Sequence, residues 1–288
     1  MRAFPHEGEG GVRAIKQACA GFVTLLLAAA APLAPAQAAE QVDLELVLAI
    51  DVSGSIDYDE AKLQRQGYID AFRDKFVLEA IQSGPHGRIA VTYFEWSGSE
   101  QQQMTTKWTI IHDAATADAF ARQLEDAPIS RGRFTSISGA IVFAIPMFEA
   151  NDYQARRKVI DISGDGPNNA GPWVNVAREL ALSRQITING LPINNDRPQF
   201  GGFGGMNLKD LDVYFEHCVI GGPDAFMIAA NGFEDFAKAV RRKMILEIAG
   251  DTPEPRFIPA QASPQIFEAT DCQVGGKMMQ SRFRDPLQ

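Results

Sequence analysis

Five oxygen-bearing side chains, spread over three segments of the chain, are candidates for binding one metal ion. Asp51, Ser53 and Ser55 alternate in the stretch DVSGS, Thr135 opens the stretch TSISGAI, and Asp165 opens the stretch DGPNN. In an extended segment alternate side chains point the same way, so the first three can face one point. Carboxylate and hydroxyl oxygens are hard donors that suit Mg²⁺, Mn²⁺ or Ca²⁺ better than zinc or copper. Two carboxylates would neutralise a divalent cation, and the five oxygens would leave room in an octahedron for a further ligand.

Each of these residues also has a purely structural explanation. Ser53 or Ser55 could cap the helix that follows them, and Asp57 could do so equally well. Thr135 could cap the next helix, and Asp165 followed by glycine and proline is a common turn sequence. The positions of the three segments in the fold decide between these interpretations.

The chain alternates apolar runs with amphipathic segments, a pattern typical of strands separated by helices. The predicted strands are residues 44–50, 88–95, 106–111, 157–164, 185–191 and 225–230. The predicted helices are residues 57–80, 115–126, 136–149, 172–183, 208–217 and 232–248, and residues 194–207 form a glycine-rich loop. The short polar link before 106–111 indicates an antiparallel hairpin. We therefore expect an α/β fold with a doubly wound, mostly parallel six-stranded sheet and one antiparallel edge strand.

In sheets of this kind, ligands bind at the carboxyl ends of the strands. Asp51 ends the first predicted strand, Asp165 ends the fourth, and Thr135 lies just before the helix that leads into the fourth. All three segments are therefore expected at one edge of the sheet. Arg131 and Arg133, beside Thr135, could steer an acidic ligand or be ordinary solvated loop charges. Asn168 and Asn169 could line the rim of the site.

With these residues and elements placed, the chain resembles the von Willebrand factor A (VWA) fold with its metal-ion-dependent adhesion site. The pattern of that family is DxSxS, then a distant threonine and a distant aspartate, and DVSGS, TSISGAI and VIDISGDG match it. The resemblance covers residues 43 to 248 and implies a VWA/Rossmann-like fold with Asp51, Ser53, Ser55, Thr135 and Asp165 as metal ligands. The stretches DVSGSID, DISGDGPNN and CVIGGPDAF resemble, more narrowly, exported bacterial VWA-like proteins of unknown function. One departure is Gly164, where many relatives have threonine.

Recognisable catalytic motifs are missing from the sequence. It contains no GxSxG nucleophile elbow and no phosphate-binding GxxxxGK[ST] loop. A strand-end aspartate suits phosphatases with an aspartyl nucleophile, but Ser53 occupies the place of their second acid. Three histidines follow the predicted export segment, and no pattern places them near Ser53: His86, His112 and His217. We therefore expect a binding protein and not an enzyme; the alternative is a metal-dependent hydrolase of an anionic substrate, which would need a general base beside the metal.

The first 38 residues have the pattern of a secretory signal peptide. Three basic residues precede the apolar stretch 18–34, and Ala36-Gln37-Ala38 is a small-x-small cleavage site. A membrane anchor is the alternative, but prolines interrupt the stretch, which is shorter than the roughly 20 residues of a span. The sequence thus predicts a VWA-like domain over 39–250, a tail over 251–288, and a periplasmic or secreted protein with no stable membrane span.

The net charge argues against nucleic acid as a partner. The whole chain carries −9, and residues 1–38 hold three basic and two acidic residues, so the remainder carries −10. Such an acidic chain is repelled by phosphate backbones and anionic membranes. The two cysteines beyond the export segment, Cys218 and Cys272, could form a disulfide in an oxidising compartment or remain as separate buried thiols.

These observations lead to one functional expectation. The protein is expected to be exported and to bind Mg²⁺, or Mn²⁺ or Ca²⁺ in its place, through the five oxygen-bearing residues. The open coordination position would bind an exposed acidic residue of a protein partner.

Overall fold

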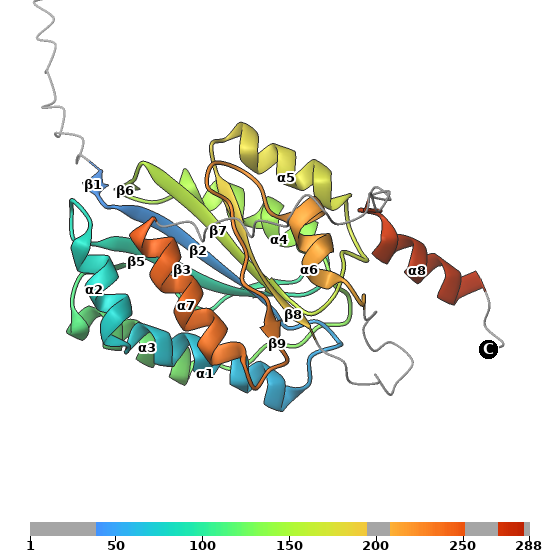
Figure 1. Cartoon of the computed structure of the whole chain (residues 1–288), viewed down its shortest axis with the longest axis horizontal. Coiled ribbons are helices and arrows are strands. Elements are labelled where there is room, and N and C mark those ends of the chain that lie inside the picture. The colour runs from blue at the N-terminus through green and yellow to red at the C-terminus, as the bar shows by residue number, and fades with distance from the viewer. Residues whose placement is uncertain (1–38, 195–207, 251–269, 285–288) are drawn as a thin grey trace, which may run out of the picture. The chain divides into compact units, whose positions relative to one another are not determined.

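A sheet of seven strands forms the centre of the computed structural model, which describes residues 39–194, 208–250 and 270–284 (Figure 1). Its strands, in spatial order, are β4 (Gln102–Met104), β3 (Ile89–Trp96), β2 (Leu44–Asp51), β7 (Arg157–Gly164), β8 (Thr187–Asn194) and β9 (Ala230–Asn231), and β5 (Thr109–Ile111) also pairs with β3. β4 and β5 run antiparallel to β3, and the remaining pairs are parallel. The predicted α/β architecture, with its mostly parallel sheet and antiparallel edge, is confirmed.

The apolar runs of the sequence form strands that are covered on both faces. All eight residues of β2, LELVLAID, are buried. Leu46 and Leu48 pack on one face of the sheet, while Val47 and Ala49 pack on the other. A parallel strand between two layers of helices needs apolar side chains on both sides, which explains the lack of alternation.

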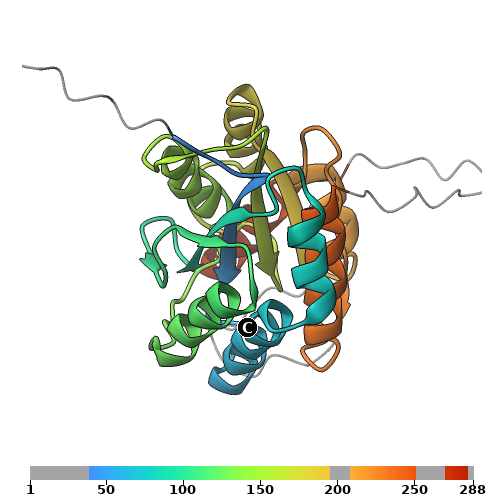
Figure 2. The ribbon, with the colours of Figure 1, turned by 90° about the vertical axis from the view of Figure 1, so that its left-hand side faces the viewer.

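Two layers of helices enclose the sheet (Figures 1 and 2). One core contains buried residues of α1 (Tyr58–Phe72), α2 (Lys75–Ser83), α3 (Ala114–Asp126) and α7 (Phe236–Ala249). The other contains residues of α4 (Ile137–Ala144), α5 (Val174–Ser183) and α6 (Leu211–Tyr214), and α6 continues into a π-helical turn over Phe215–Val219.

Two predicted helices are divided in the structure. The segment 57–80 forms α1 and α2, because Asp74 accepts a hydrogen bond from Phe76 N at 2.8 Å and starts a new helix. The segment 136–149 forms α4 followed by a 3₁₀ turn over Ile145–Phe148, as expected from Pro146, which cannot continue the α-helical hydrogen bonds. The remaining helix boundaries differ by a few residues.

The two edges of the sheet are less regular than the sequence predicts. The predicted strand 106–111 is replaced by two short segments, β4 and β5, so the sheet has one strand more than expected within the described residues. The predicted strand 225–230 was wrong for most of its length, since only Ala230 and Asn231 form β9. Before β9, a single parallel bridge joins Met227 to Gly190, and Phe226 N donates to the side chain of Asn189 at 3.0 Å instead of to a backbone carbonyl.

The structure adds elements that the sequence did not predict. β1 (Glu40–Gln41) pairs with β6 (Tyr153–Gln154) in a separate two-stranded sheet, and α8 (Val274–Arg284) lies in the predicted tail. The predicted export segment, residues 1–38, and the glycine-rich loop from residue 195 onward lie outside the described residues, as does the start of the tail. No helix in the described ranges is long and apolar enough to cross a membrane.

Candidate metal-binding site

The site begins at β2, the strand at which the order of the sheet reverses. β2 lies between β3 and β7, so the chain connections leave it in opposite directions. In α/β sheets, such a switch point opens a crevice at the carboxyl ends of the strands. Asp51 is the last residue of β2, and Asp165 directly follows Gly164, the last residue of β7. The two acids therefore lie where this fold class binds ligands.

Hydrogen bonds connect all five predicted ligands in one cluster. Asp51 Oδ1 accepts a bond from the backbone N–H of Ser53 at 2.7 Å. The Ser53 Oγ atom lies 3.1 Å from Ser55 Oγ and 3.3 Å from Thr135 Oγ1. Ser55 Oγ donates to Asp165 Oδ1 at 2.5 Å. The fold thus brings together side chains from three distant segments.

Neighbouring residues provide the helix caps that could have explained these side chains. Asp57 caps α1, accepting from the Glu60 backbone N–H at 2.8 Å. Ser136 caps α4, accepting from the Gly139 backbone N–H at 3.1 Å. Ser53, Ser55 and Thr135 are therefore not the caps of these helices.

The two carboxylates are buried, and no ion pair with a described residue neutralises them. Asp51 and Asp165 are at most 3% exposed, and Oδ2 of each accepts no hydrogen bond from the described residues. Burial, followed by the charge of Asp165, raises the pKa of Asp51 well above its usual value. Burial also raises the pKa of Asp165 to about 6. Two buried acids with a free oxygen each, surrounded by hydroxyls, fit a hard divalent cation, which would stabilise both in the charged form.

Gly164 gives the carboxylate of Asp51 its space. A β-carbon added at Gly164 would lie 3.1 Å from Asp51 Oδ2 and 3.6 Å from the indole of Trp96. The glycine that departs from the VWA pattern therefore allows Asp51 to approach the end of β7 closely.

A buried ion pair holds the connection that leads to Thr135. The guanidinium of Arg65 contacts the Glu95 carboxylate, and both groups are nearly inaccessible to solvent. Arg65 also donates to the carbonyls of Leu124 at 3.3 Å and Pro128 at 3.1 Å, and Glu95 accepts from Ser130 N at 2.7 Å. The end of α3 and the following loop are thereby anchored to α1 and β3.

Asn169 supports the site in a way that the sequence did not reveal. Its side chain accepts a hydrogen bond from Thr135 N at 2.9 Å, and its backbone N–H donates to Thr135 O at 2.8 Å. The adjacent Asn168 braces its own loop, because its amide donates to the carbonyls of Ala170 and Pro172 at 3.2 and 3.1 Å. The sequence motif NN did not distinguish these two roles.

The other polar residues singled out in the sequence lie at the rim or away from the site. Arg131 and Arg133 are exposed on the loop before Thr135. His86 donates its backbone N–H to Asp43, which precedes β2, and so lies near the opposite end of that strand.

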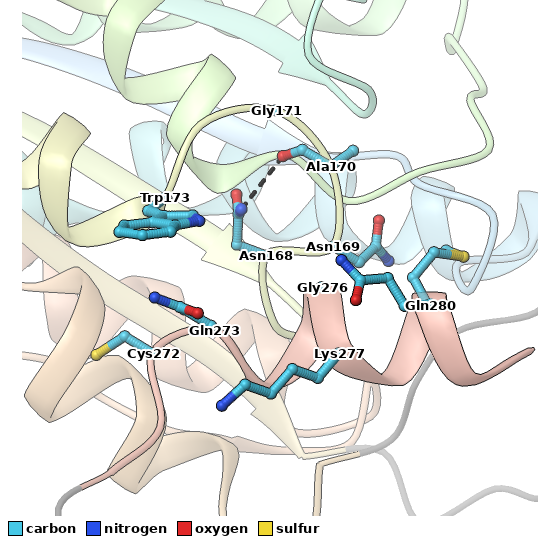
Figure 3. Close-up of a pocket in the computed structure, with 11 residues that line it drawn as sticks. Asn168, Asn169, Ala170, Gly171, Trp173, Cys272, Gln273, Gly276, Lys277 and Gln280 are labelled. Carbon is cyan, nitrogen blue, oxygen red and sulfur yellow. Dashed lines mark hydrogen bonds between the residues drawn. The ribbon is translucent and has the colours of Figure 1, made fainter.

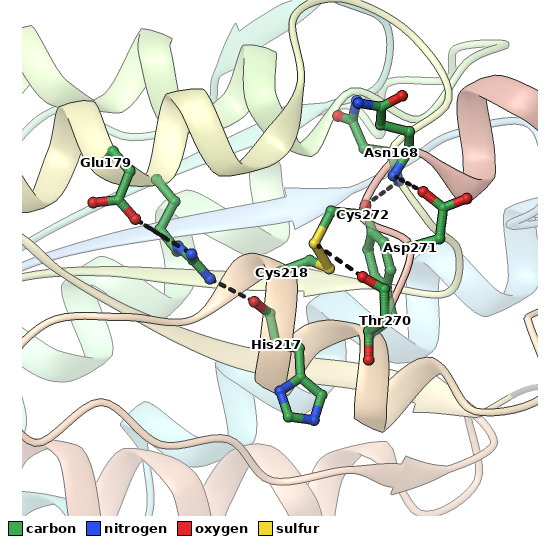
Figure 4. The surroundings of a disulfide bond; sticks show 10 residues. Asn168, Glu179, His217, Cys218, Thr270, Asp271 and Cys272 are labelled. Atoms are coloured by element: carbon green, nitrogen blue, oxygen red, sulfur yellow. Dashed lines mark hydrogen bonds and ion pairs between the residues drawn. A yellow bond between two sulfur atoms is a disulfide. The ribbon is translucent and has the colours of Figure 1, made fainter. Parts of the chain in front are cut away.

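The disulfide between Cys218 and Cys272 is present (Figure 4). The two Cα atoms are 5.4 Å apart, and Cys218 is fully buried in the π-helical turn. Two residues after Cys272, α8 begins, and Val274 packs against the core beneath α5 and α6. The bond therefore fixes the described C-terminal segment to the domain.

Solved structures with the same fold include two proteins that share little sequence with this chain. Proximal thread matrix protein 1 from the mussel byssus aligns with a TM-score of 0.53 and 13% identity, over 73% of this chain and 49% of that one. The pilus adhesin SpaC from Lactobacillus rhamnosus GG aligns with a TM-score of 0.51 and 14% identity, over 73% of this chain and 32% of the adhesin. The chain thus spans about half of the first protein and a third of the second, and the likeness supports the VWA-like fold alone.

Sequence comparison identifies the family. No curated protein matches the sequence. A family model described as a protein of unknown function (DUF1194) matches residues 41–252, which include all five candidate ligands. The chain therefore belongs to the DUF1194 family.

Proposed function

We propose that this protein is an exported, cation-dependent binding protein. Asp51, Ser53, Ser55, Thr135 and Asp165 would hold Mg²⁺, or Mn²⁺ or Ca²⁺ in its place, directly or through water. The bound cation would supply a positive charge with an open position that an acidic side chain of a protein partner can fill.

The observation that carries this proposal is the pair of buried carboxylates. Asp51 and Asp165 each keep one oxygen without a hydrogen-bond donor among the described residues, in a cluster that contains three further hydroxyl groups. Such an arrangement is costly in the absence of a cation, because buried acids close together disfavour each other's ionisation. A divalent ion would offset both costs.

A binding role suits this site better than hydrolysis. A metal-dependent hydrolase needs a base that can accept a proton from the attacking water. One further acid among the described residues is Glu60, whose charge contributes to the raised pKa of Asp165. Its carboxylate accepts the backbone N–H of Asp57 at 2.9 Å in the α1 cap, so it already has a structural role.

Export fits the same assignment. A disulfide persists in an oxidising compartment, and the sequence begins with the pattern of a signal peptide. A pilus adhesin is among the proteins of similar fold. A partner would then be a protein of the periplasm, the cell surface or the surrounding medium.

Affinity capture tests the proposed function. The immobilised protein is incubated with an extract of exported proteins in Mg²⁺, and bound material is eluted with a chelator. We expect a protein that elutes with the chelator, is not retained by the Asp51→Asn variant, and fails to rebind when one of its exposed acids is changed to the amide. Equal retention by the wild type and Asp51→Asn would contradict the proposal.

A further inference from the structure

A cavity of about 380 Å³ lies directly beside the candidate cation site, between the loop after β7 and α8 (Figure 3). Asn169 lines the cavity and also exchanges two hydrogen bonds with Thr135. A single residue therefore separates the cavity from a candidate metal ligand. The loop that contains Asp165 continues to Trp173 and forms one wall. One stretch of backbone therefore serves both the cation site and the cavity.

The opposite wall is α8, which approaches the loop unusually closely. A β-carbon added at Gly275 would lie 2.3 Å from the carbonyl oxygen of Asn168, so only glycine permits this contact. The Cys218–Cys272 disulfide fixes the start of the helix. Gly275 and Cys272 lie beyond the stretch 41–252 that the family model matches, whereas Cys218 and Asn168, to which they are attached, lie within it.

The cavity presents neutral hydrogen-bonding groups next to an aromatic ring. Asn169, Gln273 and Gln280 each offer an amide that can both donate and accept. The charged group of the described lining is the ammonium of Lys277, which lies 2.7 Å from the Asp271 carboxylate, so most of the lining is neutral. Paired donors and acceptors of this kind match the N–H and C=O groups of a peptide backbone.

An exposed apolar stripe continues from the cavity along α5. Trp173 is 59% exposed, and Val176 and Leu180, three and seven residues further on, are 56% and 41% exposed. Residues at this spacing lie on one face of a helix. An exposed tryptophan is a typical anchor for an apolar side chain of a partner. Val176 and Leu180 extend the apolar surface beside it, and a hydroxyl-rich glycan would leave that aliphatic part of the stripe unused.

We infer that the cavity between Trp173 and α8 is the second half of the binding surface and takes a peptide segment of the partner. The acidic residue of that segment lies at the cation, its backbone bonds to the amides of the cavity, and a neighbouring apolar side chain rests on Trp173. This inference rests on the proposed function, since it places the acid at the cation. The cation supplies the attraction for the acid, and the cavity selects the residues that flank it.

A random peptide library displayed on phage tests the inference. Phage are selected on the immobilised protein in Mg²⁺ and eluted with a chelator, and the selected peptides are then synthesised. We expect peptides with an acidic residue beside an apolar one. Trp173→Ala and Gln280→Ala should each weaken their binding by about tenfold or more, as truncation of an interface anchor does. The melting-temperature rise caused by Mg²⁺ alone should be unchanged in both variants.

Matched controls separate the cavity from general surface effects. Leu63→Ala removes an exposed apolar side chain and Gln66→Ala an exposed glutamine amide on α1, outside the cavity, and both should leave peptide binding unchanged. Mg²⁺-dependent peptides that bind both cavity variants as well as the wild type would overturn the inference and leave the proposed function intact. A failure to select any Mg²⁺-dependent peptide would overturn both. Mg²⁺-dependent binding to an array of glycans, without peptide binding, would show that the cavity takes a sugar and would overturn the inference.

Discussion

At the scale of single residues, the site is defined by a division of roles between sequence neighbours. Thr135 faces Ser53 and the cluster of oxygens, while Ser136 caps α4. The same division occurs before α1, where Ser55 bonds to Asp165 and Asp57 caps the helix. Replacing one of two neighbouring residues should therefore affect cation binding, while replacing the other should affect the stability of a helix.

Thr135 and Ser136 provide a matched pair of variants. Ser136→Ala should lower the free energy of unfolding by about 1 kcal/mol through the loss of a helix cap. It should keep the stabilisation by Mg²⁺. Thr135→Ala should show the reverse, with a small loss in chelator and a much reduced gain when Mg²⁺ is added. Urea unfolding with and without Mg²⁺ measures both quantities, and an equal Mg²⁺ gain in the two variants would remove Thr135 from the ligand set.

The sequence was sufficient to name these residues but not their supports. The oxygen types and their alternate spacing pointed to a cation, and the strand-end positions of Asp51 and Asp165 pointed to one edge of the sheet. The contribution of Asn169 depends on the path of a loop, and that of Gly164 depends on how closely β2 and β7 approach each other at their ends. A local sequence pattern encodes neither the path of that loop nor the separation of the two strand ends.

At the scale of elements, a buried charge cluster attaches α7 to the sheet. The ammonium of Lys243 lies 2.7 Å from Asp161 of β7 and 3.2 Å from Glu247, and all three side chains are at most 1% exposed. Asn189 of β8 donates to Glu247 at 2.6 Å. Two acids thus share one cation in the core. Burial, as the largest cause, raises the pKa of Asp161 to about 7, although Lys243 acts against it.

The cluster predicts opposite effects for its members. Lys243→Met leaves two buried acids without a cation and should destabilise the protein by about 3–5 kcal/mol at neutral pH. Asp161→Asn leaves the balanced pair of Lys243 and Glu247, and should cost far less. Chemical denaturation at pH 7 compares the two variants with the wild type. A larger loss for Asp161→Asn than for Lys243→Met would contradict the account of the cluster.

The same cluster predicts a pH dependence with a definite sign. The folded state keeps the proton on Asp161 up to a pKa of about 7, whereas an unfolded aspartate loses it near pH 4. The contribution of Asp161 to stability therefore falls as the pH rises from about 4 to 7 and is constant above that range. Subtracting the pH profile of Asp161→Asn from that of the wild type isolates this contribution. A difference that rises with pH would show that the sign is wrong.

The elements themselves were largely predictable, because the central strands are long apolar runs between amphipathic helices. The prediction failed where a side chain or a cap replaced regular structure. Asp74 divided a predicted helix in two, and the N–H of Phe226, before β9, bonds to the side chain of Asn189 instead of to a strand carbonyl. α8 was missed because it contains two glycines near its start and follows a proline-rich segment.

At the scale of the whole molecule, the disulfide joins α8 to a domain that already has two complete cores. The residues between Cys218 and Cys272 form a closed loop, since the two cysteines are 54 positions apart. Closing such a loop restricts the unfolded chain and should stabilise the folded state by about 2–4 kcal/mol. The bond thereby also maintains the wall of the cavity beside the site.

Removal of the disulfide should therefore lower stability without abolishing the fold. The double variant Cys218→Ser, Cys272→Ser should unfold at lower denaturant concentration than the wild type, and a reductant should shift the wild type towards the variant. The reductant should leave the double variant unchanged, which controls for unrelated effects. Two reactive thiols in the unfolded, unreduced protein would show that the bond does not form.

The central claim is that Asp51 and Asp165 hold a divalent cation at the carboxyl edge of the sheet. It is tested most directly by melting the chelator-treated protein while Mg²⁺, Mn²⁺ or Ca²⁺ is added. A cation bound only by the folded state stabilises it by about 2.7 kcal/mol at a hundredfold excess over Kd. We expect a rise in the Tm of the wild type and of Asp126→Asn, an exposed control on α3, and no rise for Asp51→Asn. A wild-type Tm that is unaffected by all three cations would contradict the metal site and the proposed function with it.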